Sequence, residues 1–263
     1  LMINLGGGVL TDLGGFIAST YKRGIPFINI PTTLLGMCDA SIGGKTGIDH
    51  QFLKNIIGTF ANPEQIFVFP KFLETLPFEE LRSGFAEMLK HGLIIDEKHW
   101  NDLISIKNLT PQSVFPFIET SMKIKQKVVD QDFTEQNIRK TLNFGHTIGH
   151  ALESLFLLKG KPIMHGEAVA LGMICETRIS MLHGLISEET SNTIISHLRK
   201  FFPDIDTKQF SVEEILNLMR NDKKNSHGTI NFSLLTGIGN SAYNCSVDAE
   251  HINKSLHYYQ NLP

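Results

Sequence analysis

The fold is decided by residues 1–30, which read LMINLGGGVLTDLGGFIASTYKRGIPFINI. Met2–Leu5 and Phe27–Ile30 are short apolar runs that predict strands, and Leu10–Tyr21 between them is long enough for a helix. A strand, a helix and a strand in this order predict a βαβ unit of a parallel sheet. Because a natural domain rarely begins inside a central strand, we expect an upstream part of this domain to be absent from the sequence.

Beyond this unit, a third strand is expected at Ile66–Phe69, and from Thr75 onward the pattern becomes helical. Asp96, Thr110 with Pro111, and Ser211 with Glu214 are the expected helix starts. The expected elements are helices from Pro77 to Leu93, Trp100–Ile104, Thr110–Val129, Arg139–Leu155, Gly166–Leu182, Ile215–Met219 and Ala249–Tyr259, and a strand at Thr229–Leu235. This order predicts an α/β, Rossmann-like nucleotide-binding domain at residues 1–75, partly missing at its N-terminus. A mostly α domain for metal and substrate is expected at residues 76–263.

Composition narrows the class of protein. The 263 residues are 41% hydrophobic, with a net charge of −3 and a pI of about 6.4, so no broad basic field indicates a nucleic-acid partner. Cys38, Cys175 and Cys245 are far apart and predict no disulfide framework, which favours a reducing, cytoplasmic location. No apolar run is long enough for a membrane helix, and no signal peptide is recognisable.

The glycine-rich turn Gly6-Gly7-Gly8 follows a predicted strand and opens a predicted helix. Such a turn lets backbone N–H groups approach a nucleotide diphosphate. A tight strand-to-helix turn without a ligand explains the same residues, so both interpretations remain open. Thr32 and Thr33 follow the next strand, and their hydroxyls are expected at the same sheet edge.

The segment Asp39–Gly47 ends in Gly-Gly-Lys-Thr but lacks the glycine spacing of a Walker A loop. Lys45, with Lys54 and Asn55 soon after it, is typical of a turn that binds a phosphorylated or acidic ligand. A solvated basic turn is the alternative.

Polar residues recur in the segment RKTLNFGHTIGH at residues 139–150. Arg139, Asn143, His146 and His150 are four, three and four residues apart, which places them on one face of a helix whose other faces are apolar. Two histidines one turn apart can share a metal ion. Because no glutamate lies between them, a zinc peptidase of the HExxH type is not expected.

Further metal ligands are expected nearby. His165 stands at the predicted start of the next helix, and Glu87 lies in an apolar helix with Lys90 one turn on. A capping role for His165 and a surface ion pair for Glu87 are the alternatives. Two imidazoles and one carboxylate would hold Zn²⁺ and leave coordination positions open, as in catalytic sites.

Taken together, these segments resemble 3-dehydroquinate synthases over almost the whole chain. The matching stretches, in the order of that family, are GGGVLTDLGGF, YKRG, PTTLLGMCDASIGGKTGID, FLKNIIG, FLETLP, GFAEMLKHG, KIKQKVVDQD, LNFGHTIGHALE, HGEAVALGM and DKKN. The family's further N-terminal strands and helices, which contact the adenosine half of NAD, are missing here, and this departure implies weak cofactor binding.

The resemblance implies site residues by position. The zinc ligands would be Glu87, His146 and His165. The positions for NAD would be Gly8, Val9, Leu10, Thr11, Asp12, Thr32, Thr33, Lys45, Lys54, Phe72, Leu73, Glu74 and Thr75. The positions for substrate would be Asp39, Lys45, Asn55, Lys90, Lys125, Arg139, Asn143, His150 and Lys224, with Lys223 adjacent to the last. Arg23 would reach the substrate phosphate of a neighbouring subunit, which implies a homodimer.

The activity implied is the conversion of a heptulosonate 7-phosphate to 3-dehydroquinate and phosphate in the shikimate pathway, a lyase reaction with NAD and Zn²⁺ or Co²⁺. NAD takes a hydride and later returns it, and an internal aldol closes the ring. Alternatives are another sugar-phosphate cyclase, a metal-dependent polyol dehydrogenase and an inactive fragment. Polyol dehydrogenases share a glycine-rich turn, but their substrates do not require so many lysine and arginine side chains.

Overall fold

A computed structural model of the chain describes residues 1–50, 53–220 and 230–262, without the side chains of residues 49–55. It divides into two compact units. The first comprises Leu1–Met88 and Ile106–Glu135, and the second comprises Leu89–Ser105 and Gln136–Pro263.

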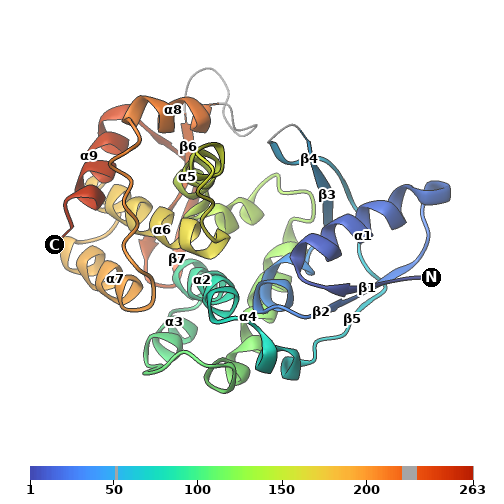
Figure 1. Cartoon of the computed structure of the whole chain (residues 1–263). Helices are drawn as coiled ribbons and strands as arrows, with labels where there is room; N and C mark the ends of the chain where they lie inside the picture. The colour runs from blue at the N-terminus through green and yellow to red at the C-terminus, as the bar shows by residue number, and fades with distance from the viewer. Residues whose placement is uncertain (51–52, 221–229, 263) are drawn as a thin grey trace. The chain divides into compact units, whose positions relative to one another are not determined.

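The first unit is built on a parallel sheet in the order β1, β2, β5. Met2 of β1 (Met2–Gly6) is paired with Phe27 of β2 (Phe27–Pro31), and Ile28 is paired with Gln65 of β5 (Gln65–Ile66). Helix α1 (Gly8–Thr20) connects the first two strands and packs against both (Figure 1). The predicted βαβ unit is therefore confirmed.

The third strand is shorter than the sequence predicted. β5 ends at Ile66, and the prediction of a strand through Phe69 was wrong. Phe67 N still donates to Asn29 O at 2.8 Å. Pro70 then begins the 3-10 helix η3 (Pro70–Thr75), and its ring nitrogen cannot donate to a sheet.

A β-hairpin lies between β2 and β5 in the chain, in a place where only a turn was expected. Strand β3 (Lys45–His50) pairs antiparallel with β4 (Leu53–Phe60), so that Lys45 lies opposite Phe60. Gly43 and Gly44 form the preceding turn, with φ of 97° and 66°. Lys45 thus begins a strand instead of ending a loop. The π-helix η2 (Gly36–Ala40) lies between β2 and this hairpin.

The helices after residue 77 begin close to their predicted residues. They are α2 (Phe78–Ile95), α3 (Glu97–Ile104) and α4 (Pro111–Gln131). The Asp96 carboxylate accepts from His99 N at 2.9 Å, and Thr110 forms a capping box with Ser113. Helix α4 packs against η2 and η3 of the first unit. The first unit therefore extends well beyond residue 75, because a helix distant in sequence returns to it.

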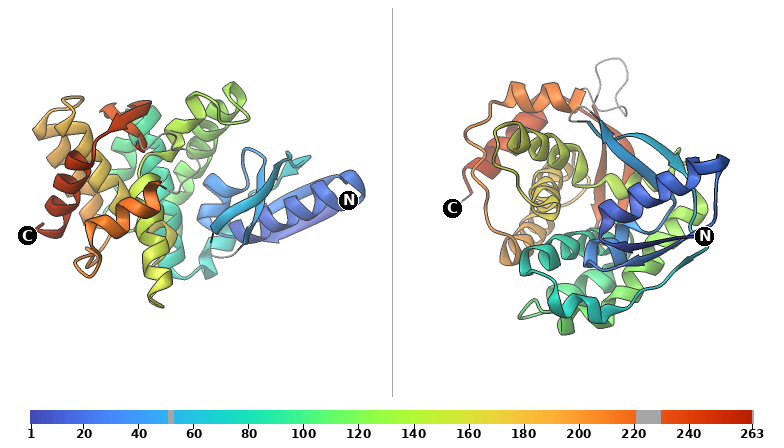
Figure 2. Two further views of the ribbon diagram at one scale, coloured as in Figure 1. Left: turned by 90° about the horizontal axis from the view of Figure 1, so that it is seen from above. Right: turned by 45° about the vertical axis from the view of Figure 1, so that its right-hand side comes forward.

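The second unit is arranged around the buried helix α6 (His165–Leu182), which contacts α5 (His146–Leu158), α7 (Glu188–Phe201), α9 (Ala249–Gln260) and strand β6 (Figure 2). Helix α8 (Val212–Arg220) packs against α5, and its Ser211–Glu214 capping box is confirmed. Strand β6 (Ile230–Gly237) pairs with β7 (Asn240–Val247). The sequence patterns did not identify α7 or β7.

The predicted single helix at Arg139–Leu155 was wrong. Residues Ile138–Asn143 form the 3-10 helix η4, and α5 begins only at His146. Between them Gly145 has a φ of 79°, a left-handed conformation that interrupts an α-helix. Arg139 and Asn143 therefore do not share a helical face with His146 and His150.

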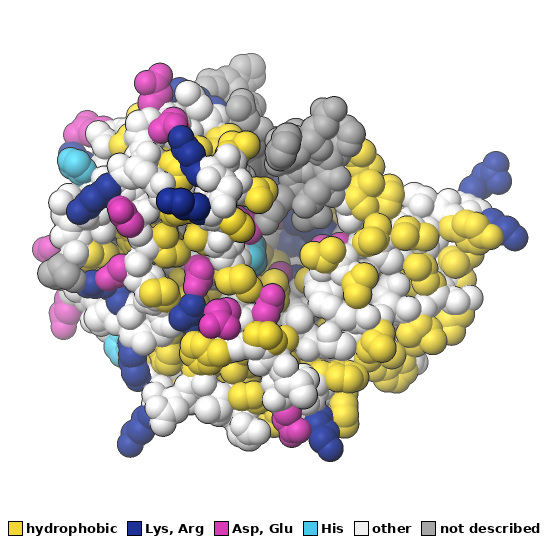
Figure 3. Space-filling view, in the orientation of Figure 1, with side chains coloured by type: hydrophobic (Ala, Val, Ile, Leu, Met, Phe, Trp, Pro, Cys, Tyr) yellow, Lys and Arg dark blue, Asp and Glu magenta, His cyan; other side chains and the backbone are white. Residues whose placement is uncertain are grey.

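The first unit exposes many large apolar side chains, and Figure 3 shows them gathered over β1 and α1. Ile3 and Leu5 of β1 are 58% and 56% exposed, and Val9 and Leu10 of α1 are 81% and 50% exposed. No helix among the described residues combines the length and the apolarity needed to span a membrane.

Candidate active site

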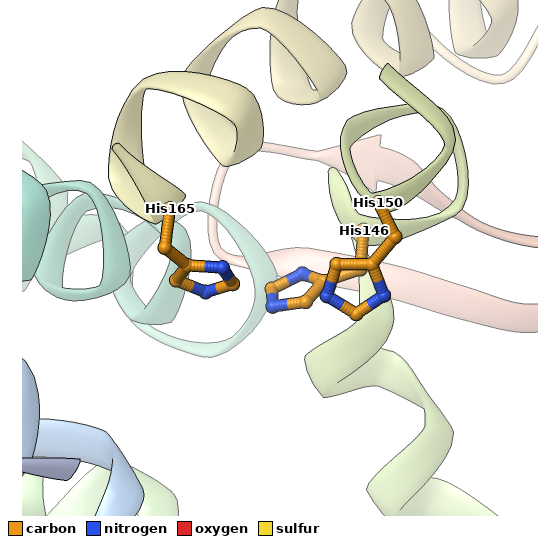
Figure 4. A group of neighbouring side chains, drawn as sticks. All are labelled: His146, His150 and His165. Atoms are coloured by element: carbon orange, nitrogen blue, oxygen red, sulfur yellow. The ribbon is translucent and has the colours of Figure 1, made fainter. Parts of the chain in front are cut away.

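Three histidines from two consecutive helices meet in the second unit. His146 and His150 lie one turn apart on α5, and His165 is the first residue of α6. One ring nitrogen of each lies within 4.8 Å of those of the other two. The ring centroids of His146 are 4.9 Å from His150 and 5.6 Å from His165, and all three rings turn toward one another (Figure 4).

Hydrogen-bond contacts distinguish the two ring nitrogens of His146 and of His165. His146 Nδ1 lies 3.1 Å from Phe144 O, and His165 Nδ1 lies 3.5 Å from a carboxylate oxygen of Glu153. Both contacts favour a proton on Nδ1, so Nε2 is the nitrogen that carries the lone pair, which is the form in which a histidine binds a metal ion. Two neighbouring imidazoles of this form, those of His146 and His165, fit Zn²⁺ or Co²⁺.

The start of α6 does not depend on His165 for its cap. The Glu167 carboxylate accepts a hydrogen bond from Met164 N at 3.2 Å, as in a capping box at this helix start. The ring of His165 lies beside those of His146 and His150 (Figure 4).

Arg139 and Asn143 lie in η4, the segment that precedes α5 in the chain. Arg139 is 2% exposed, and Asn143 is half-buried. Ser233 Oγ of β6 donates to Lys140 O at 2.6 Å, so η4 is bonded to the strand pair β6–β7. The segment at residues 139–150, which was predicted as one helix, is thus a 3-10 helix followed by the start of α5.

In the first unit, Lys125 of α4 pairs with Asp39 of η2. Lys125 Nζ lies 2.9 Å from Asp39 Oδ1 and also donates to the Asp39 carbonyl oxygen. A carboxylate oxygen of the wholly buried Glu87 lies within 4.8 Å of one of Asp39. Burial raises the pKa of the neighbouring Cys38 thiol, so this cysteine remains protonated and is not a nucleophile.

Lys45 forms an ion pair with Glu135, a residue that the sequence patterns did not identify. Glu135 follows α4 in a turn and has a φ of 60°. The turn packs against Gly44, because a Cβ on Gly44 would lie 2.9 Å from the Phe133 ring. The ion pair of Lys45 and Glu135 joins residues 90 positions apart, and no local sequence pattern could have indicated it.

The glycine-rich turn and the threonines lie together at the carboxyl ends of β1 and β2, as expected. Thr32 N donates to Gly6 O at 2.9 Å, and Gly36 N donates to Thr33 Oγ1 at 3.0 Å. A Cβ on Gly8 would lie 3.0 Å from the Ala40 side chain. This edge is where open α/β sheets bind their ligands.

The remaining candidate residues are dispersed. Lys90 lies on α2 and is 1% exposed, Arg23 is exposed at the end of the 3-10 helix η1 (Tyr21–Arg23), and Phe72, Leu73, Glu74 and Thr75 lie in η3. Lys224 and the side chains of Lys54 and Asn55 lie outside the described residues. Glu87 belongs to the first unit and the three histidines to the second, so the ligand set Glu87, His146 and His165 stays a prediction.

The comparison with protein families decides where the chain belongs. Residues 1–83 match the family model of the 3-dehydroquinate synthase N-terminal region, and residues 84–225 match that of the C-terminal region. The chain belongs to the 3-dehydroquinate synthase family.

Individual relatives agree with this. The chain is 43% identical to the 3-dehydroquinate synthase of Parabacteroides distasonis, with 99% of this chain and 74% of that protein covered. It is 40% identical to the 3-dehydroquinate synthase of Campylobacter concisus, with 98% of this chain and 74% of that protein covered.

Solved structures of other enzymes have a similar fold. The 2-epi-5-epi-valiolone synthase of Streptomyces hygroscopicus, solved with NAD⁺ and Zn²⁺, has a TM-score of 0.84 at 27% identity, with 98% of this chain and 72% of that chain covered. A 2-deoxy-scyllo-inosose synthase solved with carbaglucose-6-phosphate, NAD⁺ and Co²⁺ has a TM-score of 0.83 at 27% identity, with 97% and 72% covered. A probable glycerol dehydrogenase of Sinorhizobium meliloti, at 14% identity and a TM-score of 0.66, covering 98% and 76%, shares the fold. The nucleotide-binding fold of the 3-dehydroquinate synthase family is thereby shared with dehydrogenases.

Proposed function

We propose that this chain converts 3-deoxy-D-arabino-heptulosonate 7-phosphate to 3-dehydroquinate and phosphate, as a carbon–oxygen lyase that acts on a phosphate. The observation that carries the proposal is the 43% identity to a 3-dehydroquinate synthase over 99% of this chain.

The proposed cofactors are NAD and Zn²⁺, with Co²⁺ as a substitute. NAD when bound would accept and return a hydride, and the metal ion when bound would polarise a substrate hydroxyl. The proposal is supported by the cofactors of the related cyclases and by the contacts that favour a proton on Nδ1 of His146 and His165. The proposed metal ligands are Glu87, His146 and His165. The proposed NAD positions are Gly8, Val9, Leu10, Thr11, Asp12, Thr32, Thr33, Lys45, Lys54, Phe72, Leu73, Glu74 and Thr75.

The substrate carries a carboxylate and a phosphate, and the proposed residues offset these charges. Lysine and arginine donate strong hydrogen bonds to both groups. The proposed substrate residues are Asp39, Lys45, Asn55, Lys90, Lys125, Arg139, Asn143, His150 and Lys224. The ion pairs of Lys125 with Asp39 and of Lys45 with Glu135 support this, because each holds an ammonium group in a defined place before substrate binds.

His150 is proposed to carry a proton between substrate and water. Imidazole as a chemical group can both accept and donate a proton, which suits general acid–base catalysis. It is half-buried, and its ring lies beside those of His146 and His165.

A homodimer in the cytoplasm completes the proposal. Arg23 would contact the phosphate of a substrate bound to the neighbouring subunit, and its exposure at the end of η1 supports this assignment. Cys38, Cys175 and Cys245 form no disulfide, which suits a reducing compartment.

The second candidate is a sugar-phosphate cyclase with a different substrate. The TM-scores of 0.84 and 0.83 to two such cyclases favour it, although their 27% identity is well below the 43% to a 3-dehydroquinate synthase. Both candidates release phosphate, so the identity of the accepted sugar phosphate distinguishes them.

The test offers the heptulosonate phosphate and, separately, glucose 6-phosphate to the purified chain with NAD⁺ and Zn²⁺, and follows phosphate release. We expect release from the heptulosonate phosphate, its loss in His146→Ala, and its retention in His257→Gln, which changes an exposed histidine of α9. Release from glucose 6-phosphate alone would assign the second candidate. Equal release by His146→Ala would reject the site.

A further inference from the structure

We propose that Glu176 is a positioning residue for His146, and that its carboxylate fixes the direction in which His146 presents Nε2 to a metal ion. The metal role of His146 rests on the proposed function, whereas the contacts of Glu176 do not. Glu176 lies on α6 and is wholly buried. Its Oε2 accepts from Gly145 N at 2.6 Å, and its Oε1 accepts from Ile148 N at 3.1 Å.

These two bonds hold the first turn of α5. The first N–H groups of a helix have no acceptor within the helix, and a carboxylate there is also favoured by the helix dipole. The residue that would normally supply a side-chain cap is Gly145, which has none to offer. The acceptor therefore comes from a residue 31 positions away on another helix.

The main chain on both sides of His146 is held as a result. Glu176 binds the amide before His146 and the amide two residues after it. The next constraint is on the ring itself, because His146 Nδ1 lies 3.1 Å from Phe144 O. With backbone and Nδ1 both fixed, the imidazole has one direction left for Nε2. A ligand fixed in this way binds metal more tightly than one that must be ordered on binding.

Two substitutions separate positioning from a purely structural role. Glu176→Gln keeps the shape of the side chain, but its amide NH₂ group would face one of the two N–H donors, so one of the bonds must be lost. Ser180→Ala is the matched control on the same helix. Ser180 Oγ donates to Glu176 O and accepts from Leu235 N at 3.0 Å, so its loss weakens α6 without removing an acceptor from the first turn of α5.

The measurements are Zn²⁺ affinity by titration, the ligand-field spectrum of the Co²⁺ form, and hydrogen exchange at Gly145 and Ile148, all without substrate. We expect Glu176→Gln to weaken Zn²⁺ binding about 10- to 100-fold, to shift the Co²⁺ spectrum and to speed exchange at the amide whose hydrogen bond is lost. Ser180→Ala should leave the Co²⁺ spectrum unchanged, even if it lowers the melting temperature by as much as Glu176→Gln does.

Equal metal affinity and an equal Co²⁺ spectrum in the two variants would overturn the proposal and leave Glu176 a structural cap. If Glu176→Gln does not fold, Glu176→Asp takes its place, since a shorter carboxylate keeps the charge but cannot reach both amides. A wild-type chain whose Zn²⁺ affinity is unchanged by His146→Ala would refute the metal role in the proposed function. Faster exchange at Gly145 or at Ile148 in Glu176→Gln would still support the positioning of His146 in that case, and unchanged exchange at both amides would overturn it.

Discussion

Gly172 of α6 lies so close to Gly145 that a Cβ on Gly172 would stand 1.8 Å from the Gly145 carbonyl oxygen. The same oxygen accepts from Gly149 N at 3.2 Å in the first turn of α5. The two helices that carry His146 and His165 can therefore approach each other only because residue 172 has no side chain.

Gly172→Ala should destabilise the second unit and displace the start of α5. Because the obstructing atom belongs to the backbone, we expect a loss of at least about 2 kcal/mol in the free energy of unfolding. Chemical denaturation measures it. Gly237→Ala is the control, since its Cβ would meet only Asn240 Nδ2 at 3.9 Å. Similar losses in both variants would contradict the close approach.

Lys125→Met should destabilise the first unit strongly. The lysine and aspartate side chains are 8% and 22% exposed, and removing one partner of a buried pair costs about 3–5 kcal/mol. Lys123→Met is a matched control two residues away, because Lys123 pairs with Glu119 at an exposed position and such a pair contributes little to stability. Asp39→Leu combined with Lys125→Met should recover part of the loss. If the losses in the free energy of unfolding from Asp39→Leu and from Lys125→Met simply add in the double variant, the two side chains do not interact.

Stability should fall between about pH 6.5 and 4 because of His99. Burial, followed by the neighbouring His91, lowers the pKa of His99 from 6.5 to about 4. The unfolded chain therefore binds a proton that the folded chain does not, so this stabilisation is complete above pH 6.5 and is lost as the pH falls toward 4. The effect amounts to about 3 kcal/mol. Denaturation midpoints across this range measure it.

The variant that tests this pH dependence is His99→Phe, which should flatten the acid side of the stability profile. His257→Gln, at an exposed position on α9, should leave the profile as it is. A profile for His99→Phe that runs parallel to that of the wild type would assign the acid sensitivity to other groups.

Glu87→Gln should lose bound zinc and phosphate release together, because an amide is a much weaker metal ligand than a carboxylate. Metal content by elemental analysis and turnover with the heptulosonate phosphate measure the two effects. Glu79→Gln, in the exposed first turn of the same helix, should change neither. Retention of zinc with full turnover in Glu87→Gln would remove Glu87 from the ligand set.

Local signals in the sequence determined much of this protein. The βαβ unit, the caps at Asp96 and Thr110, and the Ser211–Glu214 box all depend on contacts within a few residues or on one period of apolar side chains. Ten family segments in order identified the family and supplied the candidate residues. Patterns of this kind can be recognised in a sequence because the interacting groups are close to one another in the chain.

Only the tertiary structure decided the geometry around those residues. A helical period runs through Gly145 in the sequence, but the close approach of Gly172 and the carboxylate of Glu176 go with a left-handed break there. Lys125 meets Asp39 across 86 residues, and Lys45 meets Glu135 across 90. Such contacts follow from how helices pack, which depends on the three-dimensional fit of side chains and backbones and not on the order of residues within any one segment.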